Sequence, residues 1–178
     1  MKLAIGSDHV GLELKPIIID YLKELGHEVE DFGPYTAERT DYPVYGKKVA
    51  EEVVSGNFDL GILICGTGVG ISNAASKVPG IRLSLVRDVL TAKTAREKLD
   101  ANVLGLGGRI TGTGLMQNIT DEFLAAQYEK TEENEKLIEK YNFLLHEKAI
   151  CLEMLGGYKS SSEAQPLLLG SINFKPMT

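Results

Sequence analysis

Short apolar runs alternate with amphipathic stretches along most of the chain, and this alternation constrains the fold more than any other feature. Runs with the length of strands lie at Lys2–Gly6, His27–Asp31, Leu60–Ile64, Ile81–Val86 and Asn102–Leu106. A strand followed by a helix, repeated with short links, is typical of a parallel sheet covered by helices on both faces. We therefore predict an α/β fold of three layers around five parallel strands, in which ligands bind at the carboxyl ends of the strands.

The stretches between these runs carry helical patterns. In the first of them, apolar residues recur with the 3.6-residue period of a helix up to Leu25, and Gly26 supplies a stop. A second helix is predicted from near Pro43 to Gly56, and a third begins within the glycine-rich turn after Cys65. The last two are predicted over about Asp88–Leu99 and about Thr113–Gln127.

The composition changes after Tyr128. A run rich in Glu and Lys leads into apolar residues at helical spacing, which have to cover either the chain's own core or another subunit. The rest mixes Gly, Ser and Pro, a composition typical of loops. We therefore predict an α/β domain over 1–128, a helical extension over 129–155 that contacts another subunit, and a loop-rich tail over 156–178.

The overall composition limits the classes of partner and compartment. With 178 residues, of which 43% are hydrophobic, the chain can bury one sizeable core. A formal net charge of -6 gives no general attraction to nucleic acid or to anionic membranes, so small molecules or other proteins are the expected partners. No apolar run approaches the ~20 residues of a membrane span or resembles a signal-peptide core, which predicts a cytoplasmic protein.

Two cysteines and three histidines leave few options for redox or metal chemistry. Cys65 and Cys151, in a chain without a secretion signal, are expected to be free thiols. Because Cys-x-x-Cys and His-Glu-x-x-His patterns are both missing from the sequence, we expect no metal site and no cofactor.

The segment Cys65–Gly70 places a thiol where a buried strand turns into a helix. Its three glycines allow the backbone to close on a ligand. Free N–H groups at a helix N-terminus bind anions, and the same field favours the thiolate form of a cysteine. Cys65 is thus a candidate nucleophile or base, and the alternative is a buried structural cysteine.

The spacing of these glycines argues against two common phosphate-binding motifs. A dinucleotide fingerprint needs Gly-x-Gly-x-x-Gly after the first strand, whereas this Gly-x-Gly-x-Gly follows the third. The sequence also lacks the Gly-x-x-x-x-Gly-Lys-Ser/Thr loop of nucleoside triphosphate sites. A smaller anion, such as an enediolate, would fit a short cradle of N–H groups.

Polar residues that follow other strands are expected at the same edge of the sheet as Cys65. After the first strand, His9 can exchange a proton with a substrate oxygen, and Asp8 can orient a sugar hydroxyl or the imidazole. The alternative is that Asp8 only caps the next helix while His9 packs at its start. Arg39 and Arg109 lie in predicted strand-end loops and are the best candidates for binding phosphate, unless they are solvated surface charges.

Taken in order, five segments resemble the ribose-5-phosphate isomerase B and galactose-6-phosphate isomerase family. They are Gly-Ser-Asp-His near the start, Arg-Thr-Asp-Tyr-Pro, Ile-Cys-Gly-Thr-Gly-Val-Gly-Ile-Ser, Asn-Val-Leu at 102–104 and Gly-Gly-Arg at 107–109. Their joint occurrence is specific, whereas each motif alone is weak. The resemblance implies a Rossmann-like sandwich, an active site shared between two subunits, and metal-free aldose–ketose isomerisation of a phosphorylated sugar.

The resemblance also implies roles for individual residues. The cysteine that matches Cys65 moves the proton between C1 and C2, and the main-chain amides of the glycine-rich turn stabilise the enediolate. Thr67 matches a position that helps with ring opening, while Asp8 and His9 match positions that contact the sugar. The substrate-binding residues predicted beyond these four are Gly66, Gly68, Val69, Gly70, Tyr42, Arg39, Asn102 and Arg109.

Two departures bear on the substrate. Members that act on ribose 5-phosphate usually carry a ring-opening histidine where this chain has Lys98, and phosphate-binding arginines where it has Glu132 and Lys136. These replacements and the segment 131–140 are similar to the B subunit of galactose-6-phosphate isomerase, which works with an A-type subunit. We therefore expect a hetero-oligomeric isomerase of galactose 6-phosphate, in which the A-type subunit supplies the missing groups.

Two other interpretations stay open. Arg109 is a feature of the ribose-type enzymes, so the chain could form a homo-oligomeric isomerase of ribose 5-phosphate or another aldose 6-phosphate, in which Lys98, Lys136 and Arg109 substitute for the usual groups. The acidic run over 129–135, where phosphate-binding arginines would be expected, would suit a non-catalytic binding subunit instead. The presence of Cys65 and its polar neighbours argues against an inert module.

Overall fold

Strands and helices alternate strictly along the chain, as the sequence predicts. The computed structural model describes residues 1–142. The elements are β1 (Lys2–Ser7), α1 (Leu14–Glu24), β2 (Glu28–Asp31), α2 (Tyr42–Val54), β3 (Leu60–Cys65), α3 (Val69–Ala75), β4 (Leu83–Leu85), α4 (Val89–Leu99), β5 (Val103–Gly107) and α5 (Thr113–Ala125). Each strand and helix predicted within residues 1–128 is present, and β4 is shorter than the apolar run that predicts it.

All five strands are parallel, in the order β2-β1-β3-β5-β4. The chain adds β2 on one side of β1 and β3 on the other, so the direction of winding reverses between β1 and β3. Strand β5 then inserts between β3 and β4. As a result β1, β3 and β5 are neighbours, and their carboxyl ends meet at the reversal point where open α/β sheets bind ligands.

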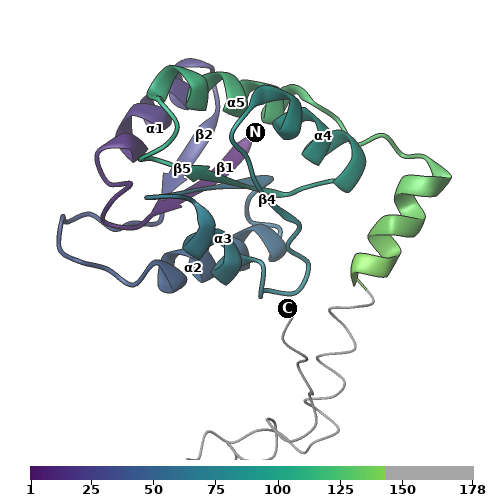
Figure 1. Ribbon diagram of the computed structural model, residues 1–178, viewed down its shortest axis with the longest axis horizontal. Helices are drawn as coiled ribbons and strands as arrows, with labels where there is room; N and C mark the ends of the chain where they lie inside the picture. The colour runs from purple at the N-terminus through teal and green to yellow at the C-terminus, as the bar shows by residue number, and fades with distance from the viewer. Residues whose placement is uncertain (143–178) are drawn as a thin grey trace, which may run out of the picture. The chain divides into compact units, whose positions relative to one another are not determined.

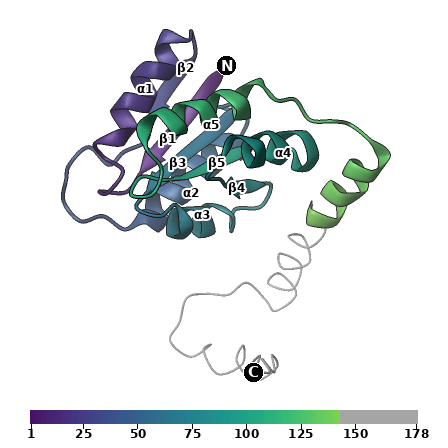
Figure 2. The ribbon, with the colours of Figure 1, turned by 45° about the horizontal axis from the view of Figure 1, so that its top comes forward.

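Helices cover both faces of the sheet (Figure 1). Helices α1, α4 and α5 lie over one face and α2 and α3 over the other, which the turned view also shows (Figure 2). Alternate residues of β3 enter different cores: Ile62 and Ile64 face the first group of helices, whereas Leu63 and Cys65 face the second. The predicted three-layer α/β architecture is thus confirmed, and it directs the Cys65 side chain toward α2 and α3.

The buried face of α1 differs from the predicted one. Ile17 and Leu25, which continue the 3.6-residue pattern, are 45% and 51% exposed. Lys15 is only 1% exposed and lies on the buried stripe with Ile18. Its Nζ donates to Asp31 Oδ1 at 2.6 Å and to the carbonyl oxygen of Pro34 at 2.7 Å. A buried ammonium has to be paired in this way, so Lys15 ties α1 to the segment that follows β2.

We expect the substitution Lys15→Met to lower the free energy of unfolding by about 2 kcal/mol. The variant loses two charge-assisted hydrogen bonds, partly offset by the apolar side chain that replaces the lysine stem. Guanidinium chloride unfolding checks this result. Lys47→Met is the matched control, because Lys47 pairs with Glu51 on the surface and its loss should change stability by less than about 0.5 kcal/mol. Equal effects of the two substitutions would contradict the structural role given to Lys15.

The predicted helical extension begins within the described part of the chain. Residues 132–142 are helical and belong to the compact unit Met1–Asn142. The remainder of the predicted extension, residues 143–155, and the predicted tail, residues 156–178, lie outside the described residues. No helix among residues 1–142 has the length and apolar character needed to cross a membrane.

Candidate active site

The loops after β1, β3 and β5 are joined by backbone hydrogen bonds at the carboxyl edge of the sheet. The Asp8 N–H donates to the carbonyl oxygen of Ile64 at 3.2 Å. The Gly108 N–H donates to the carbonyl oxygen of Cys65 at 2.7 Å, and the Arg109 N–H donates to that of Gly66 at 2.9 Å. The structure therefore gathers polar residues from three strand ends in one place, as the parallel arrangement predicts.

Cys65 is the last residue of β3 and is only 4% exposed. Its Sγ accepts a hydrogen bond from the Gly68 N–H at 3.1 Å. Gly68 can donate in this direction because it adopts the left-handed conformation, with φ at 81°, immediately before α3. The Gly68 N–H therefore fixes the position of the sulfur at the carboxyl end of β3.

The glycine-rich turn lies between two predicted substrate-binding side chains. A Cβ placed on Gly70 would lie 2.8 Å from atoms of the Tyr42 ring, so this ring covers the start of α3. A Cβ placed on Gly66 would lie 3.6 Å from Arg109 Cδ, so the arginine stem runs along the turn. Thr67 is exposed between them. Glycine at position 70 thus allows the Tyr42 ring to approach the backbone closely, whereas Arg109 lies at ordinary van der Waals distance from position 66.

Asp8 orders its own loop and leaves one oxygen for a ligand. Its Oδ1 accepts from the N–H groups of Val10 at 2.9 Å and of Gly11 at 3.1 Å, and its side chain is buried. Within residues 1–142, Oδ2 accepts no hydrogen bond, and it can therefore bind a sugar hydroxyl. The alternative that Asp8 caps the next helix is wrong, because α1 begins six residues later and its N-cap residue is Glu13.

His9 is held by the loop that precedes α2. Its N–H donates to Thr40 Oγ1 at 3.1 Å, and its Nδ1 accepts from the Thr40 N–H at 3.3 Å. Arg39 is exposed beside this contact. Within the Arg-Thr-Asp-Tyr-Pro segment, the sequence predicts a substrate-binding role for Arg39 and Tyr42 and no role for Thr40. Because the two residues are 31 positions apart, no local pattern of the sequence indicates the contact between Thr40 and His9.

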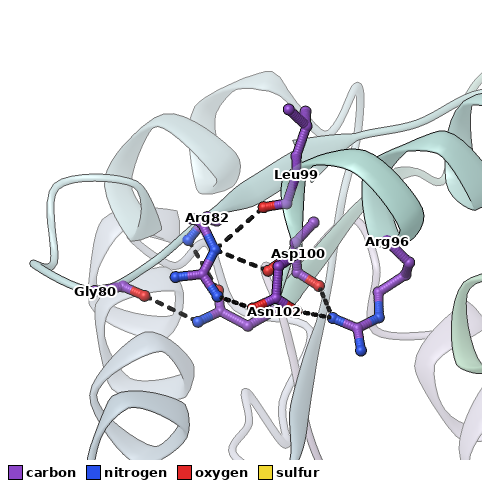
Figure 3. Close-up of polar contacts among 7 residues, drawn as sticks. Gly80, Arg82, Arg96, Leu99, Asp100 and Asn102 are labelled. Atoms are coloured by element: carbon purple, nitrogen blue, oxygen red, sulfur yellow. Dashed lines mark hydrogen bonds and ion pairs between the residues drawn. The ribbon is translucent and has the colours of Figure 1, made fainter. Parts of the chain in front are cut away.

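Asn102, by contrast, precedes β5 and lies at the amino edge of the sheet. Its Oδ1 accepts from the Arg82 N–H at 2.8 Å, and its Nδ2 donates to the carbonyl oxygen of Gly80 at 2.9 Å (Figure 3). Both polar ends of the side chain are therefore used in holding the start of β4 and β5 together. The chain does not bring Asn102 to Cys65.

The same network holds the turn between α4 and β5. Asp100 has φ at 45°, a conformation that few residues other than glycine adopt, and it accepts from Arg82 at 2.6 Å and from Arg96 at 3.1 Å (Figure 3). Arg82 Nε also donates to the carbonyl oxygens of Leu99 and Asp100. These two arginines thus stabilise the backbone of the turn and are not gathered at the carboxyl edge.

Lys98 and Lys136 are paired with carboxylates elsewhere on the chain. Lys98 lies in the last turn of α4 and forms an ion pair with Glu129. This hydrogen-bonded carboxylate raises the pKa of Lys98, which therefore stays protonated at neutral pH. Lys136 pairs with Glu132 at 2.5 Å, one helical turn earlier. Neither lysine contacts the loops that carry Cys65 and His9.

The residues that could bind a metal ion are dispersed. Among residues 1–142, no group of three or more His, Cys, Asp or Glu side chains is placed so that it could hold one. Cys65 is a free cysteine with its sulfur bound to a backbone amide. The described site therefore offers an acid–base thiol, a carboxylate, an imidazole, a guanidinium and backbone N–H groups.

The chain is similar in sequence and fold to known proteins. The chain is 54% identical over 145 residues to the galactose-6-phosphate isomerase subunit LacB of Clostridium acetobutylicum, covering 82% of this chain and 84% of that protein. It is 50% identical over 128 residues to ribose-5-phosphate isomerase B of Escherichia coli, covering 72% and 86%. The solved structure of ribose-5-phosphate isomerase B from Clostridium thermocellum matches with a TM-score of 0.81 and 46% identity, over 83% of this chain and 99% of that one.

The family profile described as Ribose/Galactose Isomerase matches residues 3–141, which include every strand and helix of the sheet domain. The motifs, the fold and the gathering of Cys65, Asp8 and His9 at one edge all lead to the same conclusion. This chain belongs to the ribose/galactose isomerase family.

Proposed function

We propose that the chain is a subunit of an aldose–ketose isomerase that converts galactose 6-phosphate to tagatose 6-phosphate. The observation that carries this proposal is the position of Cys65. Its sulfur lies at the carboxyl end of β3 and accepts an N–H from the glycine-rich turn, and backbone hydrogen bonds join this strand end to the loops that bear Asp8, His9 and Arg109. A base, a sugar-binding carboxylate and a cation are the groups that such an isomerisation requires.

In the proposed reaction the sugar ring first opens, and Thr67 assists this step. The Cys65 thiolate then takes the proton from C2 while the C1 aldehyde oxygen gains the electron pair, which gives an enediolate. The same sulfur returns a proton to C1 while the proton of the O2 hydroxyl passes to O1, so that the carbonyl group ends at C2 and no atom is gained or lost. N–H groups of the glycine-rich turn stabilise the enediolate oxygens, as an oxyanion hole does.

The remaining predicted residues bind the substrate. Asp8 Oδ2 and the His9 ring contact hydroxyl or ring oxygens, and Tyr42 packs beside them over the turn. Arg109 or Arg39 binds the phosphate group, because both guanidinium groups are exposed in loops at this edge of the sheet. These roles follow from the resemblance to the family and from the gathering of the residues.

Two observations favour the hexose phosphate as substrate. The match to the galactose-6-phosphate isomerase subunit is longer than the match to the Escherichia coli ribose-5-phosphate enzyme, 145 against 128 residues, and its identity is higher. In addition, Lys98, Glu132 and Lys136 replace the histidine and arginines that are typical of the ribose-type enzymes. A changed set of phosphate-binding groups is expected when the phosphate lies one carbon farther from the reacting atoms.

A second subunit is part of the proposal. Lys98, Lys136 and Asn102 lie away from the Cys65 edge of their own chain, so they can reach a Cys65 site only across an interface. We infer that an A-type subunit supplies the missing phosphate-binding groups in a cytoplasmic hetero-oligomer, with the extension over 129–155 at the contact. In the alternative homo-oligomer, Arg109 carries the phosphate, which its position along Gly66 favours.

Coupled assays on galactose 6-phosphate and ribose 5-phosphate test the proposal, first with the purified chain and then with an added A-type subunit. We expect turnover of the hexose phosphate only, and only after the partner is added. Turnover of ribose 5-phosphate by the chain alone would replace this proposal with the homo-oligomeric isomerase. If neither sugar phosphate is turned over and calorimetric titration shows no binding of either one, with or without the partner, the chain is a non-catalytic subunit.

A further inference from the structure

Two hydrogen bonds join His9 to Thr40, which is 31 residues away in the chain. One runs from the His9 backbone N–H to Thr40 Oγ1, and the other runs from the Thr40 backbone N–H to the imidazole Nδ1. The hydroxyl therefore fixes the His9 backbone while the amide fixes its ring. Together the two bonds determine both where His9 lies and how its ring is turned.

The second bond also selects the tautomer of the ring. A nitrogen that accepts an N–H carries no proton, so the proton of neutral His9 is on Nε2. With the proton on Nδ1, the His9 ring N–H would face the Thr40 backbone N–H, and the hydrogen bond between them would be lost. His9 is thus prepared as a hydrogen-bond donor through Nε2–H.

The position of Thr40 is set by the scaffold at both ends of its loop. At the start, Lys15 Nζ donates to the carbonyl oxygen of Pro34, and the Ser7 N–H donates to that of Gly33 at 3.0 Å. At the other end, Tyr42 begins α2 and packs against Gly70. The residues between, 35–39, are exposed. Because both ends of its loop are held, Thr40 can fix the position and the ring orientation of His9.

We propose that Thr40 is a positioning residue for His9, which it holds as the Nε2–H tautomer so that this N–H donates to an oxygen atom of the sugar phosphate. The proposal rests on the proposed function only in naming a sugar phosphate as the ligand. It assigns His9 the part of a donor to a substrate oxygen in the bound state. A base acting through Nε2 would need the opposite tautomer.

Nitrogen NMR of the histidine rings tests the tautomer directly. The chain has three histidines, and a His9→Gln variant identifies the His9 signals. We expect wild-type His9 to carry its proton on Nε2. T40V keeps the backbone N–H that bonds Nδ1 but loses the hydroxyl that holds the His9 backbone, so we expect the ring to move off this N–H and a mixture of the two tautomers to form. T36V is the matched control in the same loop and should leave the signals unchanged.

Kinetics of the active assembly then test the consequence. We expect T40V to lower kcat/KM about 10-fold to about 100-fold, T40S to restore most of the loss, and T36V to match the wild type, since displacing a reacting group by about 1 Å can cost about 10²-fold. A wild-type proton on Nδ1, or unchanged tautomer and kcat/KM in T40V, would overturn the proposal. If H9Q turns over normally while the NMR result holds, the role of His9 in the proposed function fails and the positioning by Thr40 stands.

Discussion

The substitution Cys65→Ala is expected to lower kcat for sugar-phosphate isomerisation by about 10³-fold or more, because it removes the only thiol that the described residues place at the reacting edge. The Cβ position is kept and the sulfur is buried against backbone, so the fold and the binding of the sugar phosphate should persist. Coupled assays of the assembly that turns over substrate measure kcat, and calorimetric titration measures the binding of the sugar phosphate.

Two further cysteine variants sharpen this test. Cys65→Ser keeps the volume and the hydrogen bond to Gly68 but replaces an acidic thiol with an alcohol, so it should also lose most of the turnover. Cys151→Ala removes the other thiol of the chain and should leave turnover unchanged. Normal activity in both C65A and C65S would mean that another group moves the proton.

The substitution Gly68→Ala is expected to destabilise the protein by about 2 to 5 kcal/mol. A Cβ at this position would lie 2.3 Å from Leu85 Cδ1 and 3.0 Å from the carbonyl oxygen of Leu106, and the residue would have to keep a φ of 81°. Any relief of this clash moves the N–H that bonds Cys65 Sγ. Loss of stability should therefore be accompanied by loss of turnover.

The variant Gly26→Ala separates the cost of the steric clash from the cost of the left-handed backbone conformation. Gly26 has a similar φ of 86°, but a Cβ there would meet no atom within 4 Å. Its variant should lose only the ~1 to 2 kcal/mol cost of a left-handed backbone and keep full turnover. Guanidinium chloride unfolding of both variants gives the comparison. If Gly68→Ala were no less stable than Gly26→Ala, the close packing of the turn against β4 and β5 would be contradicted.

The elements could be predicted from sequence because each has a strong local pattern. The run before Cys65 is long enough for one strand and too short for a helix, and Gly26 and Gly56 end their helices with positive φ. Strand order could not be predicted. Local patterns do not state which strands pair, and the insertion of β5 between β3 and β4 depends on how helices of both layers pack.

The candidate site was predictable in part for a geometric reason. Residues that follow β1, β3 and β5 share one edge of the sheet, and this brings Asp8, Cys65 and Arg109 together. The contributions of Lys15 and Thr40 depend on pairing with distant backbone, which no spacing rule describes. Lys15 did carry a signal, since it occupies a position of the buried helical face between apolar neighbours.

Proton NMR of galactose 6-phosphate in heavy water tests the central claim most directly, with the wild-type assembly and its C65A variant compared at equal concentration. The proton that Cys65 takes from C2 exchanges with solvent deuterium before the sulfur returns it to C1, so the wild type should form tagatose 6-phosphate that carries deuterium at C1. The C65A variant should leave the aldose unconverted and unlabelled. Labelled ketose formed by C65A at close to the wild-type rate would contradict proton transfer by Cys65.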